Sequence, residues 1–316
     1  MNWQLRVLVT LVSSFTWMAA SGCLAQSTTA ARLAGEIQNA ELMVQQPSSQ
    51  NDGTAWWKLG MLYQNAARYR DAERCYAHAT SLLRHGDSRT LADALDSMGT
   101  VYVETGDYAK AAPLENQALA MREAGNDSIG VGRSWMHLAM LSLGEKDASS
   151  AARYTQMAVQ RLVHREAQDG SAGTPEEQMT ALIGLALARC AQGTFQGAID
   201  PLKRAHRLAL EDKDAGDFPA GYTDFLLGYA EWRESDNRQA AQLMKKGTAG
   251  IEAELGWGHP TYISVMTQYE TFLEQAGQFT EAAAVKTKLA QVEASQRPAQ
   301  QVAIRTNAAA PIPASH

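Results

Sequence analysis

The chain has 316 residues, of which 45% are hydrophobic and 20% are charged, and its formal net charge is −6. This length suffices for one long helical array or for two globular domains. The mildly acidic balance offers no basic stretch of the kind that binds nucleic acid, so nucleic acid is not expected as a partner.

Residues 1–25 have the features of a secretory signal peptide. Arg6 supplies the positive start, and residues 7–20 form a largely apolar run that is too short to span a bilayer. Two cleavage points stay open. Cleavage after Ala25 would release a soluble protein, whereas cleavage before Cys23 would resemble the processing of a bacterial lipoprotein and leave an acylated cysteine. We therefore expect an exported protein, periplasmic or extracellular, that contacts a membrane only if Cys23 is lipidated.

Residues 28–52 are predicted to form a capping helix and a loop. Apolar residues recur at helical spacing over residues 28–46, and a run rich in Pro, Ser, Asn and Gly follows. We expect this helix to pack on the first unit of the segment 53–292.

The most informative stretch of that segment contains two apolar stripes at helical spacing. The first stripe has the pattern W-x2-L-G-x2-Y and consists of Trp56, Leu59, Gly60 and Tyr63. The second stripe consists of Ala72, Tyr76 and Ala79. Two helices can cross closely only where small side chains meet, and Gly60 and Ala72 meet that need. A glycine inside a helix costs about 1 kcal/mol relative to alanine, so a packing reason for Gly60 is expected.

The same pattern of small residues recurs along the chain in six units. The second helix of each unit opens on an alanine, namely Ala72, Ala111, Ala151, Ala198, Ala240 and Ala282. Twelve residues before each alanine lies another Gly or Ala, except at Glu270 in the last unit. This layout resembles the tetratricopeptide repeat family. The spacing of 39 to 47 residues between these alanines is partly similar to the longer repeats of kinesin light chains.

The resemblance implies an all-α fold, a right-handed superhelical solenoid of about six tetratricopeptide-type hairpins over residues 53–292. Cys75 and Cys190 fall in different units, so we expect both to be free and buried. Residues 293–316 contain three prolines and no periodicity, which predicts a disordered tail.

The sequence shows no constellation typical of catalysis. It contains no nucleophile elbow, no phosphate-binding glycine loop and no histidine or cysteine at metal-ligand spacing. The acid pairs Asp93/Asp96 and Glu176/Glu177 could act as carboxylate pairs, but a solvated helix face is the simpler interpretation. We expect no catalytic residue, no cofactor and no metal, and a protein that is not an enzyme.

The resemblance also implies that the first helix of each unit lines a concave inner face. The positions three before, one after and four after each small residue point to that face, and in the third to fifth units they are apolar or aromatic. The predicted partner-binding groove consists of Trp57, Met61, Met136, Met140, Ile183, Leu187, Tyr222, Phe225, Tyr229 and Trp232. Such a groove would suit an extended or helical apolar peptide. The alternative is that strong curvature buries these side chains between neighbouring first helices.

The predicted function is a non-enzymatic protein-binding scaffold of the cell envelope or periplasm. Its partner would be a protein or peptide segment held in the groove, and the sequence does not identify it. One alternative is a structural subunit of an envelope assembly, which would associate through the convex face or the ends of the solenoid. An enzyme would need a polar cleft with converging titratable groups, and none can be read from the sequence.

Overall fold

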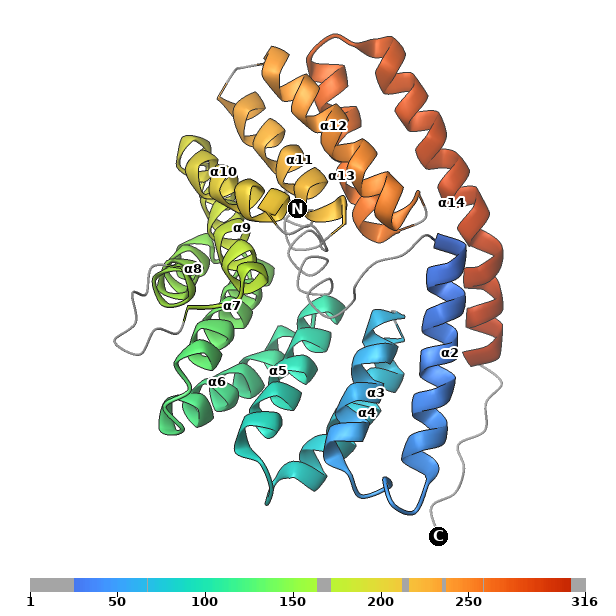
Figure 1. Cartoon of the computed structure of the whole chain (residues 1–316). Coiled ribbons are helices and arrows are strands. Elements are labelled where there is room, and N and C mark those ends of the chain that lie inside the picture. Colours follow the sequence, from blue (N-terminus) through green and yellow to red (C-terminus); the bar gives the residue numbers. More distant parts are fainter. Residues whose placement is uncertain are drawn as a thin grey trace.

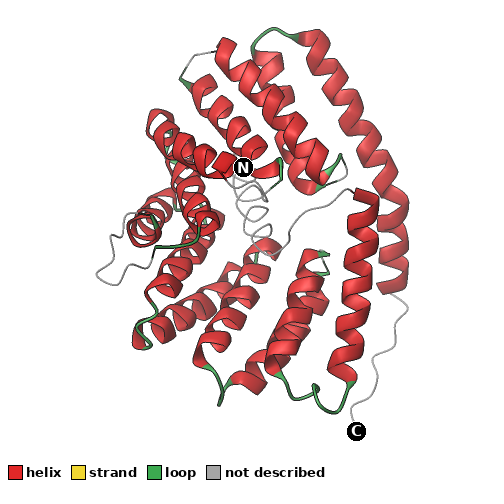
Figure 2. Ribbon diagram, viewed as in Figure 1, coloured by secondary structure: helices red, strands yellow, loops and turns green. Residues whose placement is uncertain are grey.

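Helices follow one another along the chain as antiparallel hairpins. The structure is a computed structural model that describes residues 26–66, 68–163, 172–211, 216–234, 237–257 and 259–307, and within these residues there is no strand (Figure 2). Their helices are α2 Gln26–Gln45, α3 Gly53–Asn65, α4 Tyr69–Leu83, α5 Ser88–Thr105, α6 Tyr108–Ala124, α7 Ser128–Gly144, α8 Ala148–Leu162, α9 Pro175–Ala191, α10 Phe195–Glu211, α11 Phe218–Arg233, α12 Asn237–Leu255, α13 Pro260–Gln275 and α14 Phe279–Asn307. The predicted signal peptide and its two cleavage points lie outside the described residues.

Six hairpins make up the array, from α3–α4, which we call repeat one, to α13–α14, repeat six. Each helix packs on the next along the chain, and α2 packs on α3 as a cap. Figure 1 shows the hairpins following one another round an arc, with α2 at one end and α14 at the other. The prediction of an all-α superhelical solenoid of six hairpins is confirmed.

Small side chains lie where the two helices of a hairpin cross, as the sequence predicts. The alanines that open the second helices are fully buried in repeats one to five, and Ala282 of repeat six is 4% exposed. A Cβ atom on Gly60 would lie 2.5 Å from the ring of Tyr76, and one on Gly228 would lie 2.6 Å from Cγ of Met244. The close approach of the two backbones therefore depends on the missing side chain.

Local signals set the ends of the helices. Asp52, Asp87 and Asp147 each precede a helix and accept hydrogen bonds from backbone N–H groups of its first turn. Gly106 and Gly277 adopt positive φ angles of 82° and 74° in the hairpin turns, a conformation that other residues rarely adopt. These caps and turns explain why the hairpins begin and end at the predicted places.

The predicted disordered tail is wrong over residues 293–307. These residues continue α14, which ends at Asn307, and residues 308–316 lie outside the described part. The segment is rich in Ala and Gln, which favour helix, so a helix that already packs against α13 can extend through it. Among the described residues, no helix combines the length and the apolar character needed to cross a bilayer.

Candidate partner-binding surface

Seven of the ten predicted groove residues are buried, so these seven do not line an open groove in the described part of repeats three to five. They are Met136, Met140, Ile183, Leu187, Tyr222, Phe225 and Tyr229. All seven belong to one hydrophobic core that runs through repeats three to six. For the four residues on α7 and α9, this burial agrees with the sequence-based alternative of contact between neighbouring first helices.

Contacts between successive first helices contribute to this burial in repeats three and four, whereas α11 of repeat five packs on α10 and α12. Helix α5 packs on α7, and α7 packs on α9. A Cβ atom on Gly184 of α9 would lie 2.5 Å from Cε of Met136, so Met136 of α7 fills the space that this glycine leaves. An inner position is therefore also a contact between repeats, and its apolar side chain belongs to the core.

The aromatic residues of repeat five also join neighbouring repeats. The ring of Tyr229 meets the rings of Phe195 and Trp232 edge-on, at centroid distances of 6.1 and 5.8 Å. Trp232 in turn meets Phe272 of repeat six at 5.5 Å. Edge-to-face pairs of this kind contribute about 0.5–1.5 kcal/mol beyond their area. Trp232 is half-buried and packs against the core, so its main role is in packing.

Trp57 and Met61 of repeat one are half-buried and pack against the core of the first repeats. The indole Nε1 of Trp57 donates a hydrogen bond to Oγ of Ser97, 3.0 Å away on α5. This bond joins the first helices of repeats one and two. Of the ten predicted residues, Trp57, Met61 and Trp232 are those that are only partly buried.

A cavity of about 140 Å³ opens between the first helices α7 and α9. Its lining consists of Arg133, Met136, His137, Leu162, Glu176, Glu177 and Thr180. Met136 and Leu162 are buried, and the other five side chains are partly exposed. The cavity therefore has apolar side chains beneath a polar and charged rim.

The rim of this cavity carries opposite charges. Nε of Arg133 lies 3.7 Å from Oε1 of Glu177, and that nitrogen is buried without a hydrogen-bond partner. Glu177 also completes the capping box of α9, since it accepts a hydrogen bond from the backbone N–H of Thr174 at 2.8 Å. The pair Glu176/Glu177 is thus part of a helix start, and beside it the Nε–H of Arg133 is a buried donor without a hydrogen-bond partner.

Asp93 and Asp96 do not form a solvated face, so the simpler interpretation of this pair is wrong. Arg122, at the end of α6, is 2% exposed and donates hydrogen bonds to both aspartates, at 2.5 Å to Oδ1 of Asp93. It also donates to Oγ of Ser134 on α7, at 2.5 Å. A buried charge needs an opposite partner, and Arg122 provides it for both carboxylates.

Two more titratable residues border this ion-pair cluster. Glu115 of α6 is fully buried. Nδ1 of His137 lies 3.0 Å from Oγ1 of Thr100, within hydrogen-bond distance, and its Nε2 lies 3.8 Å from Oδ2 of Asp96. Burial lowers the pKa of His137 below its usual value. The cluster thus joins α5, α6 and α7 beside the cavity, which His137 also lines.

Comparison with known proteins supports the repeat architecture. Residues 52–124 match the family model described as tetratricopeptide repeat. A comparison with curated proteins gives no match for the sequence. The fold is a tetratricopeptide repeat solenoid.

Solved structures of other repeat proteins superpose on most of this solenoid. The apo form of RapI has 11% identity and a TM-score of 0.63, over 84% of this chain and 92% of that one. A Rap protein complexed with Competence and Sporulation Factor has 14% identity and a TM-score of 0.53, over 78% and 76%. The kinesin light chain-like repeats of Podosopora anserina have 20% identity and a TM-score of 0.50, over 69% and 100%. The partial resemblance to the kinesin light chain type is confirmed.

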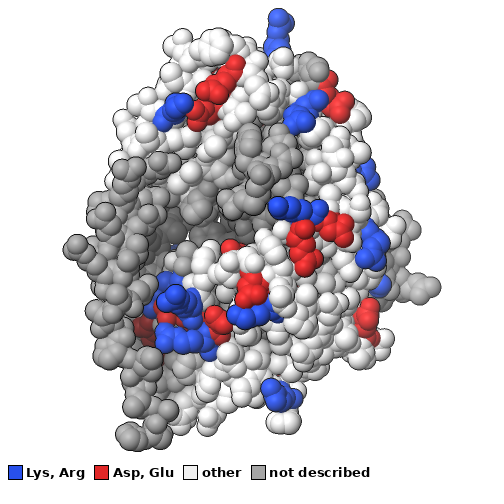
Figure 3. Space-filling view, turned by 180° about the vertical axis from the view of Figure 1, so that it is seen from behind, with Lys and Arg blue, Asp and Glu red and all other residues white. Residues whose placement is uncertain are grey.

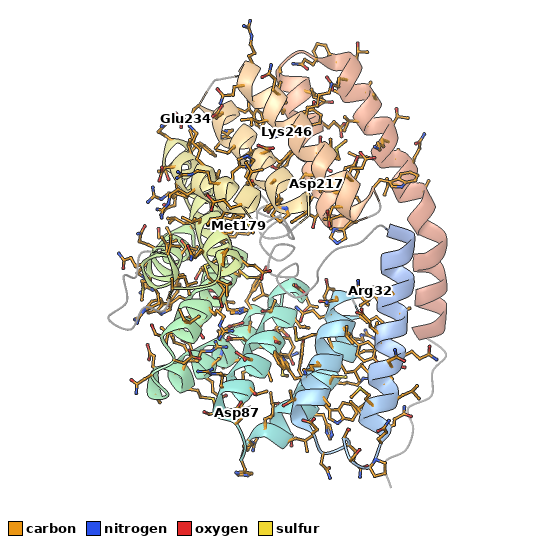
Figure 4. The ribbon with its side chains drawn as sticks, in the orientation of Figure 1. Arg32, Asp87, Met179, Asp217, Glu234 and Lys246 are labelled. Atoms are coloured by element: carbon orange, nitrogen blue, oxygen red, sulfur yellow. The ribbon has the colours of Figure 1, made fainter. Side chains whose placement is uncertain are left out.

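In this tetratricopeptide solenoid the cavity lies between the first helices of repeats three and four. A second polar contact lies further along, where Asp224 of α11 pairs with Lys246 of α12 at 2.8 Å (Lys246 is labelled in Figure 4). Seen from behind, Lys and Arg are interspersed with Asp and Glu over the surface (Figure 3). Among the described residues, no group of three or more His, Cys, Asp or Glu has the geometry of a metal site.

Cys75 and Cys190 are free and buried, as expected. Burial raises the pKa of Cys75 to about 11 and that of Cys190 to about 12. Each therefore stays a thiol at neutral pH, the form that reacts slowly and does not ligate metals.

Proposed function

We propose that this protein is a non-enzymatic scaffold that binds a segment of a partner protein. The segment lies along the inner face, and one of its apolar side chains enters the cavity between α7 and α9. The cavity carries this proposal, because it is an open recess between two first helices over the buried apolar side chains of Met136 on α7 and Leu162 on α8. The family supports it as well, since a similar fold was solved as a complex with Competence and Sporulation Factor.

The volume of the cavity limits the size of the peptide side chain that can enter it. An engineered protein cavity of about 150 Å³ binds benzene, so a cavity of about 140 Å³ fits a phenyl or leucine-sized group. The thioether of Met136 would make a favourable contact with an aromatic ring. Burying such a side chain contributes about 1.5–3 kcal/mol.

The rim of the cavity suits the backbone of the bound segment. The Nε–H of Arg133 is buried and unpartnered, and if the guanidinium turns toward the cavity it can donate to a carbonyl oxygen next to the inserted side chain. An unmade hydrogen bond of a buried donor costs about 1–3 kcal/mol, so a peptide that satisfies Arg133 gains more than one that leaves it unpaired. We therefore propose a peptide with one Phe or Leu anchor as the ligand.

The proposed location is the cell envelope or periplasm. The signal-peptide pattern of residues 1–25 supports it, with release after Ala25 or acylation at Cys23 as its two forms. Labelling cells with a radioactive fatty acid and fractionating them would separate these two forms from each other and from a cytoplasmic protein.

Binding can be tested with a display library of peptides selected on the purified protein. Thr180→Trp puts a large side chain into the cavity, and we expect it to abolish binding of the selected peptides. Thr267→Trp is a matched control, because Thr267 lies exposed on the first helix of repeat six. Both threonines donate a hydrogen bond to the carbonyl four residues earlier at 2.8 Å. Equal affinity of the wild-type protein and Thr180→Trp would rule out the cavity as the site.

The alternative function, a structural subunit that associates through the ends of the solenoid, has one observation in its favour. Leu42 and Met43 of the capping helix α2 are each 55% exposed. Exposed apolar residues at an end of an array can contact another chain. Sedimentation of the wild-type protein and of the variant with both residues changed to Glu tests this. A concentration-dependent dimer that the double variant loses would favour the alternative.

A further inference from the structure

The most unusual titratable group in the described structure is the carboxyl group of Glu115. It lies at the crossing of α5 and α6 in repeat two and has no exposed surface. It occupies the space beside Gly99, where a Cβ atom would overlap with Oε1 of Glu115. The missing side chain at position 99 thus makes room for a buried acid, whereas Gly60 makes room for the Tyr76 ring in repeat one.

Neither carboxyl oxygen of Glu115 has a hydrogen-bond partner when the group is ionised. Oδ1 of Asp96, which interacts with Glu115, also lacks a partner. Two ionised carboxylates can only accept, so their oxygens would face each other without a proton between them. One proton on Glu115 turns this arrangement into a hydrogen bond and satisfies the Asp96 oxygen.

The cation that acts on Glu115 is Arg122, and two aspartates already pair with it. From α5 it faces Asp96, with Asp93 beyond, and from α6 it faces Arg122. From α7, His137 lies next to Asp96, and its lowered pKa keeps it neutral. The guanidinium of Arg122 is already shared by two aspartates, so an ionised Glu115 would be a third buried carboxylate beside one cation.

We propose that Glu115 is kept as a neutral acid at neutral pH and donates its proton to Asp96, which forms a proton-dependent clamp. The clamp ties α6 to α5, while Arg122 ties both helices to Ser134 of α7. Loss of the proton removes the hydrogen bond and places a second net negative charge in the joint. The joint between repeats two and three then loosens at alkaline pH. This inference does not depend on the proposed peptide binding.

The direction of the pKa agrees with this geometry. Burial, and then the negative charge of Asp96, raise the pKa of Glu115 well above its usual value. The folded state therefore binds this proton more tightly than the unfolded chain does. The resulting stabilisation is complete when the pH is below about 4.3, the pKa of a glutamate in the unfolded chain. It is lost as the pH rises through the pKa of Glu115 in the folded protein.

The test compares Glu115→Gln with the wild-type protein. Glutamine has the shape of the neutral acid, and its NH₂ group can donate to Asp96 at any pH. We expect the equilibrium constant for folding of the wild-type protein, divided by that of Glu115→Gln, to fall by up to tenfold for each unit of rising pH. The readout is the urea midpoint from pH 5 to pH 9. Glu123→Gln is the matched control on α6, because Glu123 is exposed, and its curve should run parallel to the wild-type curve.

Parallel curves for the wild-type protein and Glu115→Gln at every pH would overturn the proposal. If Glu115→Gln does not fold, the infrared spectrum of the Glu104→Gln variant still tests the proposal, because that change removes the other carboxyl group whose pKa is raised, to about 7. The infrared absorption of a protonated carboxyl group should be present in that variant at neutral pH and should fade as pH rises. Its absence at neutral pH would equally overturn the proposal.

Discussion

Gly60→Ala tests whether the small residues exist for close packing. The new Cβ atom would lie 2.5 and 2.6 Å from two ring carbons of Tyr76, whereas carbon atoms in good contact are about 3.5–4.0 Å apart. The ring cannot move away easily, because Tyr76 is fully buried and its hydroxyl donates a hydrogen bond to Gln64 at 2.8 Å. Overpacking of this kind costs about 1–3 kcal/mol, and loss of the Tyr76 hydrogen bond adds about 1 kcal/mol.

The helix itself favours the alanine by about 1 kcal/mol, so this gain must be subtracted. The expected net loss in the free energy of unfolding for Gly60→Ala is then about 1–3 kcal/mol. Gly35→Ala is the matched control, because Gly35 lies inside α2 and its Cβ would have no atom within 4 Å. That change should stabilise the protein by up to about 1 kcal/mol.

The assay is urea unfolding of the two variants and the wild-type protein, followed by circular dichroism and tryptophan fluorescence. Opposite shifts of the two midpoints are the expected outcome. A Gly60→Ala variant as stable as the wild-type protein would refute the reasoning, because the glycine would then have no role in the crossing of α3 and α4.

Three further predictions follow from the buried polar groups. Arg122→Met leaves two aspartates without their cation, so we expect the free energy of unfolding in urea to fall by about 3–5 kcal/mol. The control is Arg74→Met, because the side chain of Arg74 is 80% exposed, and it should change the free energy of unfolding by less than about 0.5 kcal/mol. Similar losses in the two variants would contradict the ion-pair cluster. Burial raises the pKa of Glu104 to about 7, so its contribution to stability is complete below about pH 4 and is lost as pH rises through about 7. Glu104→Gln should therefore flatten the fall of the thermal midpoint between pH 5 and 8, and an unchanged slope would show that Glu104 titrates normally. Cys75 and Cys190 should react slowly with a maleimide in the folded protein and quickly in urea, and rapid labelling of the folded protein would contradict their burial.

The first helices of repeats two to four carry most of the polar chemistry of the described structure. The ion-pair cluster, the buried acid and the cavity all contact α5, α7 or α9. His137 belongs to both the cluster and the cavity lining, so a change at the joint would reach one wall of the cavity. Peptide affinity measured on Glu115→Gln would show whether the two are linked.

The sequence by itself determined the six hairpins and their positions. The signals are apolar side chains spaced three and four residues apart, aspartates before helices and glycines after them. Each acts on the backbone within a few residues of itself, so it can be recognised in the sequence. The small residues at Gly60 and Ala72 also indicated which helix faces meet, because close packing depends on side-chain size at one crossing point.

Only the tertiary structure decided what the inner face contains. Met136, Ile183 and Phe225 have the spacing of an inner surface, but all three are buried, because α7 packs on α9 and α11 packs on α12. The partnership of Arg122 with Asp96 likewise joins residues that are 26 positions apart. Periodicity sets the direction in which a side chain points along its own helix, whereas burial and charge pairing depend on what the rest of the chain places opposite it.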